Sequence, residues 1–364
     1  MKRLLLLTYI ISSVLYGQNA TNDTISASEI SNNLLKELVI KHKATGVVAG
    51  ISQGDTILWK SSYGYMDLKN HKKANTEMRT RIASISKPMT AIAVMQLFEK
   101  GLIQLDEPIQ TYIKEFPSVS TNKITIRHVL NHTSGIKGYA SAKETETRKN
   151  YSTLTEAMNF FKDRELHAEP GEEYNYTTYG YVVLGVLIER VSGESFEDYM
   201  IKNIWKKAGM NNTGVEHNGE TYENKTQLYA KRKNGKVKHV KKGNNLSNRV
   251  PGGGFYSTVN DMLKFGQAVI NNTLIKEETL KMMFEDNGLK KEGNPIGLGL
   301  YMYGGQPNPE EVLGHSGEQT GVSSQLFIIP SQQKVIIVLC NTSGVWGETV
   351  GTAVKILRAH KKKE

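Results

Sequence analysis

The chain has 364 residues, of which 38% are hydrophobic and 23% are charged, a composition that excludes an intrinsically disordered or collagen-like chain. Its net charge of +10 favours contact with an anionic surface such as a bacterial envelope. The basic runs have no interleaved aromatic residues, so nucleic-acid binding is not expected.

Residues 1–17 are predicted to be a signal peptide rather than part of the fold. Lys2 and Arg3 form a short basic region, and the apolar run 4–15 is too short to span a membrane comfortably. A polar linker over residues 18–28 follows. We therefore expect an exported protein, periplasmic or secreted, with no stable membrane span after cleavage. A retained N-terminal anchor is the alternative.

The first part of the fold is predicted to be a helix over residues 30–39 and a β-hairpin from residues 46–52 and 56–65. Within the hairpin, Gly50–Gly54 matches the G-x-S-x-G nucleophile elbow of α/β-hydrolases, which requires a strand before the serine and a helix after it. A second strand follows here instead. Catalysis at Ser52 is therefore the less favoured alternative.

The next predicted helix carries a serine and a lysine that suggest a catalytic role. Ser84 and Lys87 are three residues apart, which places them on one face of a helix that is apolar nearly all round and is stopped by Gly101. Pro88 falls in the first turn, where proline is tolerated. Burial disfavours the charged form of a lysine and lowers its pKa below the usual value of about 10.4. A neutral amine beside a hydroxyl is a base beside a latent nucleophile.

His128 and His132 have the i,i+4 spacing that can hold a metal ion on a helix. No glutamate lies between them in the H-E-x-x-H manner, and no other Cys/His cluster supplies further ligands. We interpret both as structural histidines near a helix end and expect no metal site.

Two helices surround a tyrosine-rich loop. Residues 153–167 are predicted to be an amphipathic helix, and residues 182–191 a buried helix that ends at Ser192-Gly193. Between them lie four tyrosines at positions 174, 176, 179 and 181, and spacing alone does not select one of them for a pocket.

Residues 226–242 are rich in lysine and are predicted to form a solvated hairpin, with Asn234-Gly235 as a type I′ turn. Gly252–Gly254 form a backbone-dominated loop before a helix that begins near Val259. No Gly-Lys-Ser/Thr follows these glycines, so a phosphate-binding loop is not expected.

Near the end of the chain, two strands are predicted over residues 323–329 and 334–341, followed by a closing helix from about Glu348. The single cysteine, Cys340, cannot form an internal disulfide and is expected to be buried. Strand pairs at both ends of the chain suggest an α+β fold, in which an antiparallel sheet built from both chain ends is flanked by helices. The expected domains are a discontinuous sheet domain, residues 29–83 and 296–364, and a mostly helical inserted domain, residues 84–295. The active site is expected at their interface.

Five segments in this order carry a resemblance to a known family: Arg81–Lys87, His128–Gly135, Pro170-Gly171 before Tyr176, Gly253-Gly254 before Ser257-Thr258, and Gly314–Gly317. The chain resembles the serine β-lactamase and penicillin-binding-protein superfamily, in particular its class C-like branch with D-aminopeptidase, D,D-carboxypeptidase and esterase relatives. The likeness covers about residues 30–359. It implies a β-lactamase/transpeptidase-like fold.

The resemblance also implies roles for individual residues. Ser84 corresponds to the acylated nucleophile and Lys87 to its activating amine. Tyr176 corresponds to the tyrosine that moves protons to the leaving group. The triplet His315-Ser316-Gly317 corresponds to the Lys-Thr-Gly triplet on the strand that lines the site, and the backbone N–H groups of Ser84 and Glu318 would form the oxyanion hole.

Two residues depart from the family pattern. Thr178 stands where the family has an asparagine that hydrogen-bonds substrate. His315 replaces a lysine that helps hold the substrate carboxylate in β-lactamases, and with a usual pKa of about 6.5 it would bind anions weakly and in a pH-dependent way. Both departures weaken the expectation of efficient antibiotic hydrolysis.

The expected function is therefore an exported serine hydrolase that cleaves an amide or ester bond through a Ser84 acyl-enzyme, as a peptidase, an esterase or a weak β-lactamase. No metal or organic cofactor is expected, and the expected partner is a small-molecule or peptide substrate, such as one derived from the cell wall. The sequence does not specify an oligomeric state. The alternative is a non-catalytic envelope protein that keeps the fold to bind peptidoglycan or to assemble with itself.

Overall fold

The computed structural model describes residues 25–117, 123–241, 243–284, 296–303 and 312–361. The predicted signal peptide and most of the predicted linker lie outside these ranges. Helix α2 begins at Ala27, with the side chain of Ser26 accepting a hydrogen bond from the N–H of Glu29 as an N-cap. The helix therefore begins slightly before the predicted end of the linker at residue 28.

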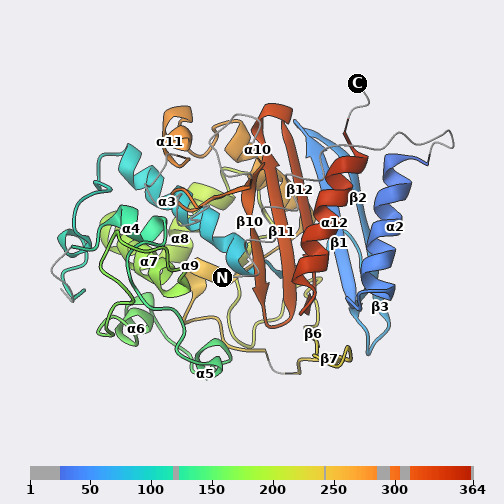
Figure 1. Cartoon of the computed structure of the whole chain (residues 1–364), viewed down its shortest axis with the longest axis horizontal. Helices are drawn as coiled ribbons and strands as arrows, with labels where there is room; N and C mark the ends of the chain where they lie inside the picture. Colours follow the sequence, from blue (N-terminus) through green and yellow to red (C-terminus); the bar gives the residue numbers. More distant parts are fainter. Residues whose placement is uncertain (1–24, 118–122, 242, 285–295, 304–311, 362–364) are drawn as a thin grey trace.

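An antiparallel seven-stranded sheet forms the centre of the molecule, in the order β3-β2-β1-β12-β11-β10-β9 (Figure 1). Strands from the two ends of the chain meet where β1 pairs with β12. This confirms the prediction that both chain ends build one sheet. The strands are β1 (Gly46–Gln53), β2 (Thr56–Asp67), β3 (Lys72–Lys73), β9 (Tyr301–Tyr303), β10 (Val312–Gln319), β11 (Val322–Ile329) and β12 (Lys334–Cys340).

Strand β12 shows why an unbroken apolar run forms a central strand. Val335, Ile337 and Leu339 pack in the core on one side of the sheet. The alternate residues, among them Ile336 and Cys340, pack in the core on the other side. Because side chains alternate between the faces of a strand, a strand that is covered on both faces needs apolar residues throughout. The prediction that Cys340 is buried is confirmed.

Helices cover both faces of the sheet. Helices α2 (Ala27–Ile40) and α12 (Trp346–Ala359) lie side by side on one face (Figure 1). Helix α10 (Val259–Ile270) covers the other face, where a Cβ on Gly266 would lie only 2.4 Å from the Cγ1 atom of Val335. Although the predicted boundaries assign residues 84–295 to a helical domain, α10 thus packs directly on the sheet.

The remaining helices gather beyond the β9 edge of the sheet, around the buried helix α3, which packs against α7 (Figure 1). Gly193 ends α7 in the left-handed conformation, with φ of 73°, as predicted. These helices are α3 (Ser86–Glu99), α4 (Ile126–Leu130), α5 (Ala142–Thr145), α6 (Leu154–Asn159), α7 (Thr178–Ser192), α8 (Phe196–Met200), α9 (Val250–Gly253) and α11 (Glu277–Met282).

The predicted helix over residues 153–167 is wrong beyond Asn159, where α6 ends. After the buried side chain of Phe161 the chain turns, and the N–H of His167 donates a hydrogen bond of 2.7 Å to the carbonyl of Gly135. This contact with a segment distant in sequence competes with continuation of the helix.

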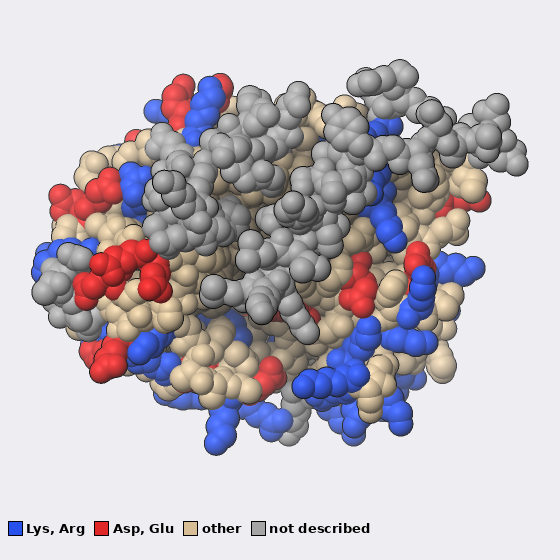
Figure 2. All heavy atoms as spheres, viewed as in Figure 1, with Lys and Arg blue, Asp and Glu red and all other residues tan. Residues whose placement is uncertain are grey.

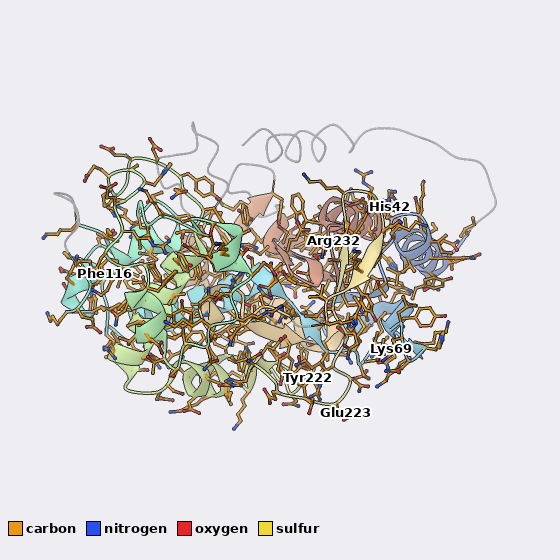
Figure 3. The ribbon with its side chains drawn as sticks, turned by 90° about the horizontal axis from the view of Figure 1, so that it is seen from below. His42, Lys69, Phe116, Tyr222, Glu223 and Arg232 are labelled. Atoms are coloured by element: carbon orange, nitrogen blue, oxygen red, sulfur yellow. The ribbon has the colours of Figure 1, made fainter. Side chains whose placement is uncertain are left out.

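The lysine-rich hairpin is formed by β6 (Tyr229–Lys231) and β7 (Val237–His239), and β6 also pairs with β13 (Thr342–Ser343). Figure 2 shows Lys and Arg side chains gathered at the lower right of the molecule, where Figure 1 labels β6 and β7. Arg232 of this hairpin is labelled in Figure 3. The predicted type I′ turn is wrong: Gly235 has a φ of 75° but Asn234 is not in the left-handed region, and type I′ requires a positive φ at both residues.

A second small sheet leads into the site, with β4 (Thr80–Arg81) and β5 (Gly214–Val215) on either side of β8 (Phe255–Ser257). Arg81 anchors this region, because its guanidinium forms two hydrogen bonds of 2.9 and 2.7 Å with the carboxylate of Glu216. Within the described ranges, none of the helices has the length and apolarity needed to cross a membrane.

Candidate active site

Ser84 lies on a 3₁₀ turn, η1 (Ala83–Ile85), between β4 and α3. Ala83 has a φ of 50°, a left-handed conformation that a residue with a Cβ adopts at a cost of about 1–3 kcal/mol unless its surroundings hold it there. The neighbouring Ile82 is held on both sides, since its N–H donates to the carbonyl of Phe255 and its carbonyl accepts from the hydroxyl of Ser324. The nucleophile candidate is therefore held by both the small sheet and β11.

Lys87 is completely buried beside Ser84, in the first turn of α3. Its Nζ donates hydrogen bonds to Oγ of Ser84 at 3.1 Å, to Oγ1 of Thr178 at 3.2 Å and to the carbonyl of Gly252 at 2.7 Å. Burial, and secondarily the positive charge of Arg249, hold the pKa of Lys87 well below its ordinary value of 10.5. A neutral amine within hydrogen-bond distance of a serine hydroxyl can accept its proton.

Tyr176 faces the same pair of residues. The centre of its ring lies 4.8 Å from Nζ of Lys87. Burial raises the pKa of Tyr176 well above 10.0, although a hydrogen bond with Ser84 opposes this shift. The phenol is therefore protonated over the whole neutral range and is suited to donate a proton rather than to act as a phenolate base.

His128 and His132 lie in different surroundings. His128 belongs to a capping box with Thr125 at the start of α4, which agrees with the structural role predicted for it. His132 is buried with its ring 4.4 Å from that of Tyr176, and its Nδ1 accepts a hydrogen bond from the N–H of Thr177. Among the described residues, no group of three or more His, Cys, Asp or Glu side chains is arranged to hold a metal ion.

His315 lies on β10, with its ring 6.1 Å from that of Tyr176 and 4.8 Å from that of Tyr301. Burial lowers the pKa of His315 to about 3. The expectation that this histidine binds anions in a pH-dependent way is therefore wrong, because a buried imidazole among aromatic rings is neutral throughout the physiological range.

Gly317 brings β10 against the segment that carries the nucleophile. A Cβ at this position would lie 2.5 Å from the carbonyl oxygen of Ile82, 2.5 Å from Oγ of Ser324 and 3.0 Å from Cβ of Ala83. Only glycine allows the strand to lie this close to the turn before Ser84. Its neighbour Ser316 is partly exposed on the same strand.

We expect Gly317→Ala to lower kcat/KM for a nitrophenyl ester by about 10- to 100-fold, because the added methyl group pushes β10 away from η1 and displacements of about 1 Å at a reacting centre have effects of this size. Gly351→Ala on α12 is the matched control, because a Cβ there meets nothing within 4 Å. Equal activity of the two variants would contradict this role of Gly317.

A cavity of about 210 Å³ opens beside the nucleophile. Ser84 and Glu318, whose backbone N–H groups are the predicted oxyanion hole, both line it, and so does Thr178. The pairing of these two N–H groups on one oxygen stays a prediction. The other lining residues are Tyr139, Thr145, Glu146, Asn244, Arg249, Gly252, Gly253, Gln319 and Thr320.

The structure thus brings together the residues predicted for the site. Lys87 donates hydrogen bonds to both Ser84 and Thr178, the ring of Tyr176 lies against Lys87, and the triplet 315–317 lies on β10. Sequence reasoning missed three contributors, which are the packing of His132 on Tyr176, the carbonyl of Gly252 and the guanidinium of Arg249. The His128–Gly135 motif was a signal for the first of these. A backbone carbonyl gives no sequence signal. Arg249 lies just before the loop Gly252–Gly254, but the sequence does not show that this arginine lines the cavity beside Ser84.

This geometry is typical of a class of protein in which a buried lysine lies within hydrogen-bond distance of a serine hydroxyl three residues before it. Comparison with known families agrees: the model of the beta-lactamase family matches residues 32–360. The chain belongs to this family and is a serine hydrolase of the beta-lactamase type.

The chain is similar to named relatives over most of its length. It is 27% identical to "Serine beta-lactamase-like protein LACTB, mitochondrial" of Homo sapiens, over 91% of this chain and 79% of the relative. It is 28% identical to "Penicillin-binding protein 4*" of Bacillus subtilis, over 85% of this chain and 70% of that protein. The structure of an octameric penicillin-binding protein homologue from Pyrococcus abyssi superposes with a TM-score of 0.78 at 26% identity, covering 92% of this chain and 77% of that one.

Proposed function

We propose that this chain is an exported serine hydrolase that cleaves an amide or ester bond through an acyl-enzyme on Ser84. The observation that carries the proposal is the position of Lys87, whose Nζ lies 3.1 Å from Oγ of Ser84. A completely buried lysine is costly to a fold, and groups with strongly shifted pKa values concentrate at functional sites.

The proposed reaction has two halves. Oγ of Ser84 forms a bond to the substrate carbonyl carbon while its proton passes to Nζ of Lys87, and the carbonyl oxygen takes up negative charge. When the bond to the leaving group breaks, the leaving nitrogen or oxygen takes a proton from the Tyr176 hydroxyl, which regains one from the Lys87 ammonium. Water then attacks the ester carbon, its proton returns to Oγ of Ser84, and the acid is released.

Export rests on the predicted signal peptide. An exported enzyme of this type would meet small esters and peptides derived from the cell wall. A relative named as a penicillin-binding protein supports penicillin as a reagent for the site. The second candidate, a non-catalytic envelope protein, does not account for a buried lysine that donates to a serine hydroxyl.

The test is the mass of the covalent adduct after exposure to a fluorophosphonate and a labelled penicillin. We expect one adduct on Ser84 in the wild type and none in Ser84→Ala. Ser86→Ala is the matched control, because its buried hydroxyl in the same turn donates to the carbonyl of Ala83 instead, and it should be labelled like the wild type.

Equal labelling of the wild type and Ser84→Ala would overturn the proposal, and so would the absence of any adduct with either reagent. Ser52→Ala tests the α/β-hydrolase alternative. Ser52 lies in a strand–turn–strand hairpin and its buried hydroxyl accepts a hydrogen bond from Nε2 of Gln267, so this variant should be labelled normally.

A further inference from the structure

Arg249 lies at the cavity beside Ser84 and is nearly as buried as the core, with only 4% of its surface exposed. Its Nη2 donates to the carbonyls of Glu144 at 3.1 Å and Thr145 at 2.7 Å, and its Nε donates to Oδ1 of Asn248 at 2.9 Å. The ring of Tyr139 covers the guanidinium at 4.7 Å. All of these partners are uncharged groups.

Other arginines that lie inward in this region have a carboxylate partner. Arg81, which is 3% exposed, pairs with Glu216 at 2.7 Å. Arg164 pairs with the carboxylate of Glu144 at 3.1 Å, which leaves only the backbone carbonyl of that residue for Arg249. Among the described residues, no carboxylate oxygen lies within 4.0 Å of the Arg249 guanidinium. A buried charge without a counter-ion is unfavourable unless a ligand supplies the opposite charge.

Burial disfavours the charged form of the other basic groups at the site. It lowers the pKa of Lys87 well below 10.5 and the pKa of His315 to about 3. Strand β10 carries His315 and no lysine. Arg249, on a different segment, is the permanent cation that lines the cavity.

We propose that Arg249 binds a carboxylate on the part of the substrate that enters this cavity, so that the preferred substrates are amides or esters with an anionic group close to the scissile carbonyl. This inference rests on the proposed function at Ser84. Arginine is suited to the role because its planar guanidinium can bind a carboxylate through two N–H groups while other N–H groups keep their backbone partners.

The rim of the cavity restricts the charge of the ligand. Glu146 and Glu318 are exposed carboxylates that also line it, and Glu318 accepts a hydrogen bond of 2.8 Å from the N–H of Gly344. They oppose a second negative charge at the entrance, although solvent weakens the effect. A monoanion or a zwitterion fits this arrangement better than a polyanion.

A purely structural role for Arg249 makes a different prediction. Its hydrogen bonds to two successive backbone carbonyls hold the end of α5 against the segment 248–249. If that were its whole role, its loss would affect charged and neutral substrates alike. The ratio of kcat/KM values for a charged and a neutral substrate therefore separates ligand binding from structural support.

The experiment compares the nitrophenyl monoester of glutarate, which carries a carboxylate, with nitrophenyl pentanoate, which has the same chain length and no charge. Rates measured with Ser84→Ala are subtracted as background. We expect the wild type to prefer the glutarate ester, and Arg249→Met to lower the ratio of the two kcat/KM values by at least about tenfold, as expected for one charge-assisted contact. Arg148→Met removes the same charge from an exposed position and should leave the ratio unchanged.

A wild type without preference for the anionic ester, or an unchanged ratio in Arg249→Met, would overturn this inference. If Arg249→Met does not fold, the same ratio is measured with Arg249→Gln. The glutamine amide can still donate to a backbone carbonyl but carries no charge. If the wild type hydrolyses neither ester and forms no adduct on Ser84, the proposed function itself is wrong.

Discussion

Replacing Lys87 with methionine should lower kcat/KM for a nitrophenyl ester by about 10³- to 10⁵-fold, because a nucleophile and its base act as a unit. Methionine matches the shape of the lysine stem and fits an apolar surrounding, so the loss of the amine is the main change. The hydrogen bond from Nζ to Oγ of Ser84, at 3.1 Å, is the contact removed. The measurement is steady-state hydrolysis, with circular dichroism to verify the fold.

Lys100→Met is the matched control, because Lys100 is the exposed C-cap of the same helix, α3. It should retain wild-type activity. A value for Lys87→Met within tenfold of the wild type would show that Lys87 is not the base.

The pH dependence of kcat/KM tests the role of Lys87 as the base independently. A base with a lowered pKa is neutral above that pKa, so wild-type kcat/KM should rise with pH through the pKa of Lys87 and reach its plateau below 10.5. The pKa of His132 is also lowered well below 6.5 and that of His315 to about 3, so neither should add a step near 6.5. A step near 6.5 that persists in Lys87→Met would assign the base to a histidine instead.

The sequence predicted those parts of the fold that depend on local pattern. The hairpin β1–β2, the buried helices α3 and α7 and the pairing of both chain ends follow from apolar periodicity and turn residues, and each is present. Helix α6 was predicted too long because a tertiary hydrogen bond, from His167 to Gly135, turns the chain away. Local pattern carries no information about such contacts.

The chemical character of the site was only partly predictable, for the same reason. The spacing of Ser84 and Lys87 predicted their contact, since both lie on one helical turn. The neutral state of His315 depends on burial among aromatic rings from other segments, among them Tyr301. Arg249 became a candidate only when the fold showed that its partners are uncharged and that it lines the cavity with the nucleophile.

Replacing Tyr176 with phenylalanine should separate amide from ester substrates. Because the pKa of Tyr176 is raised well above 10.0, its hydroxyl keeps its proton and can give it to a departing atom. An amine leaves only when protonated, whereas nitrophenolate is stable as an anion at neutral pH. We therefore expect kcat for an amide such as a D-amino-acid amide to fall by about 10³-fold, and kcat for a nitrophenyl ester by about tenfold at most.

Tyr181→Phe is the control for this substitution. The ring of Tyr181 also lies near Lys87, with its centre 5.5 Å from Nζ, but its hydroxyl donates to the carbonyl of Leu130. It should reduce both activities by the same small factor. If Tyr176→Phe likewise lowers amide and ester hydrolysis equally, the hydroxyl of Tyr176 positions Ser84 and does not protonate the leaving group. Lys87, as its ammonium after the first proton transfer, would then be the nearest acid, and the same enzyme would favour esters over amides.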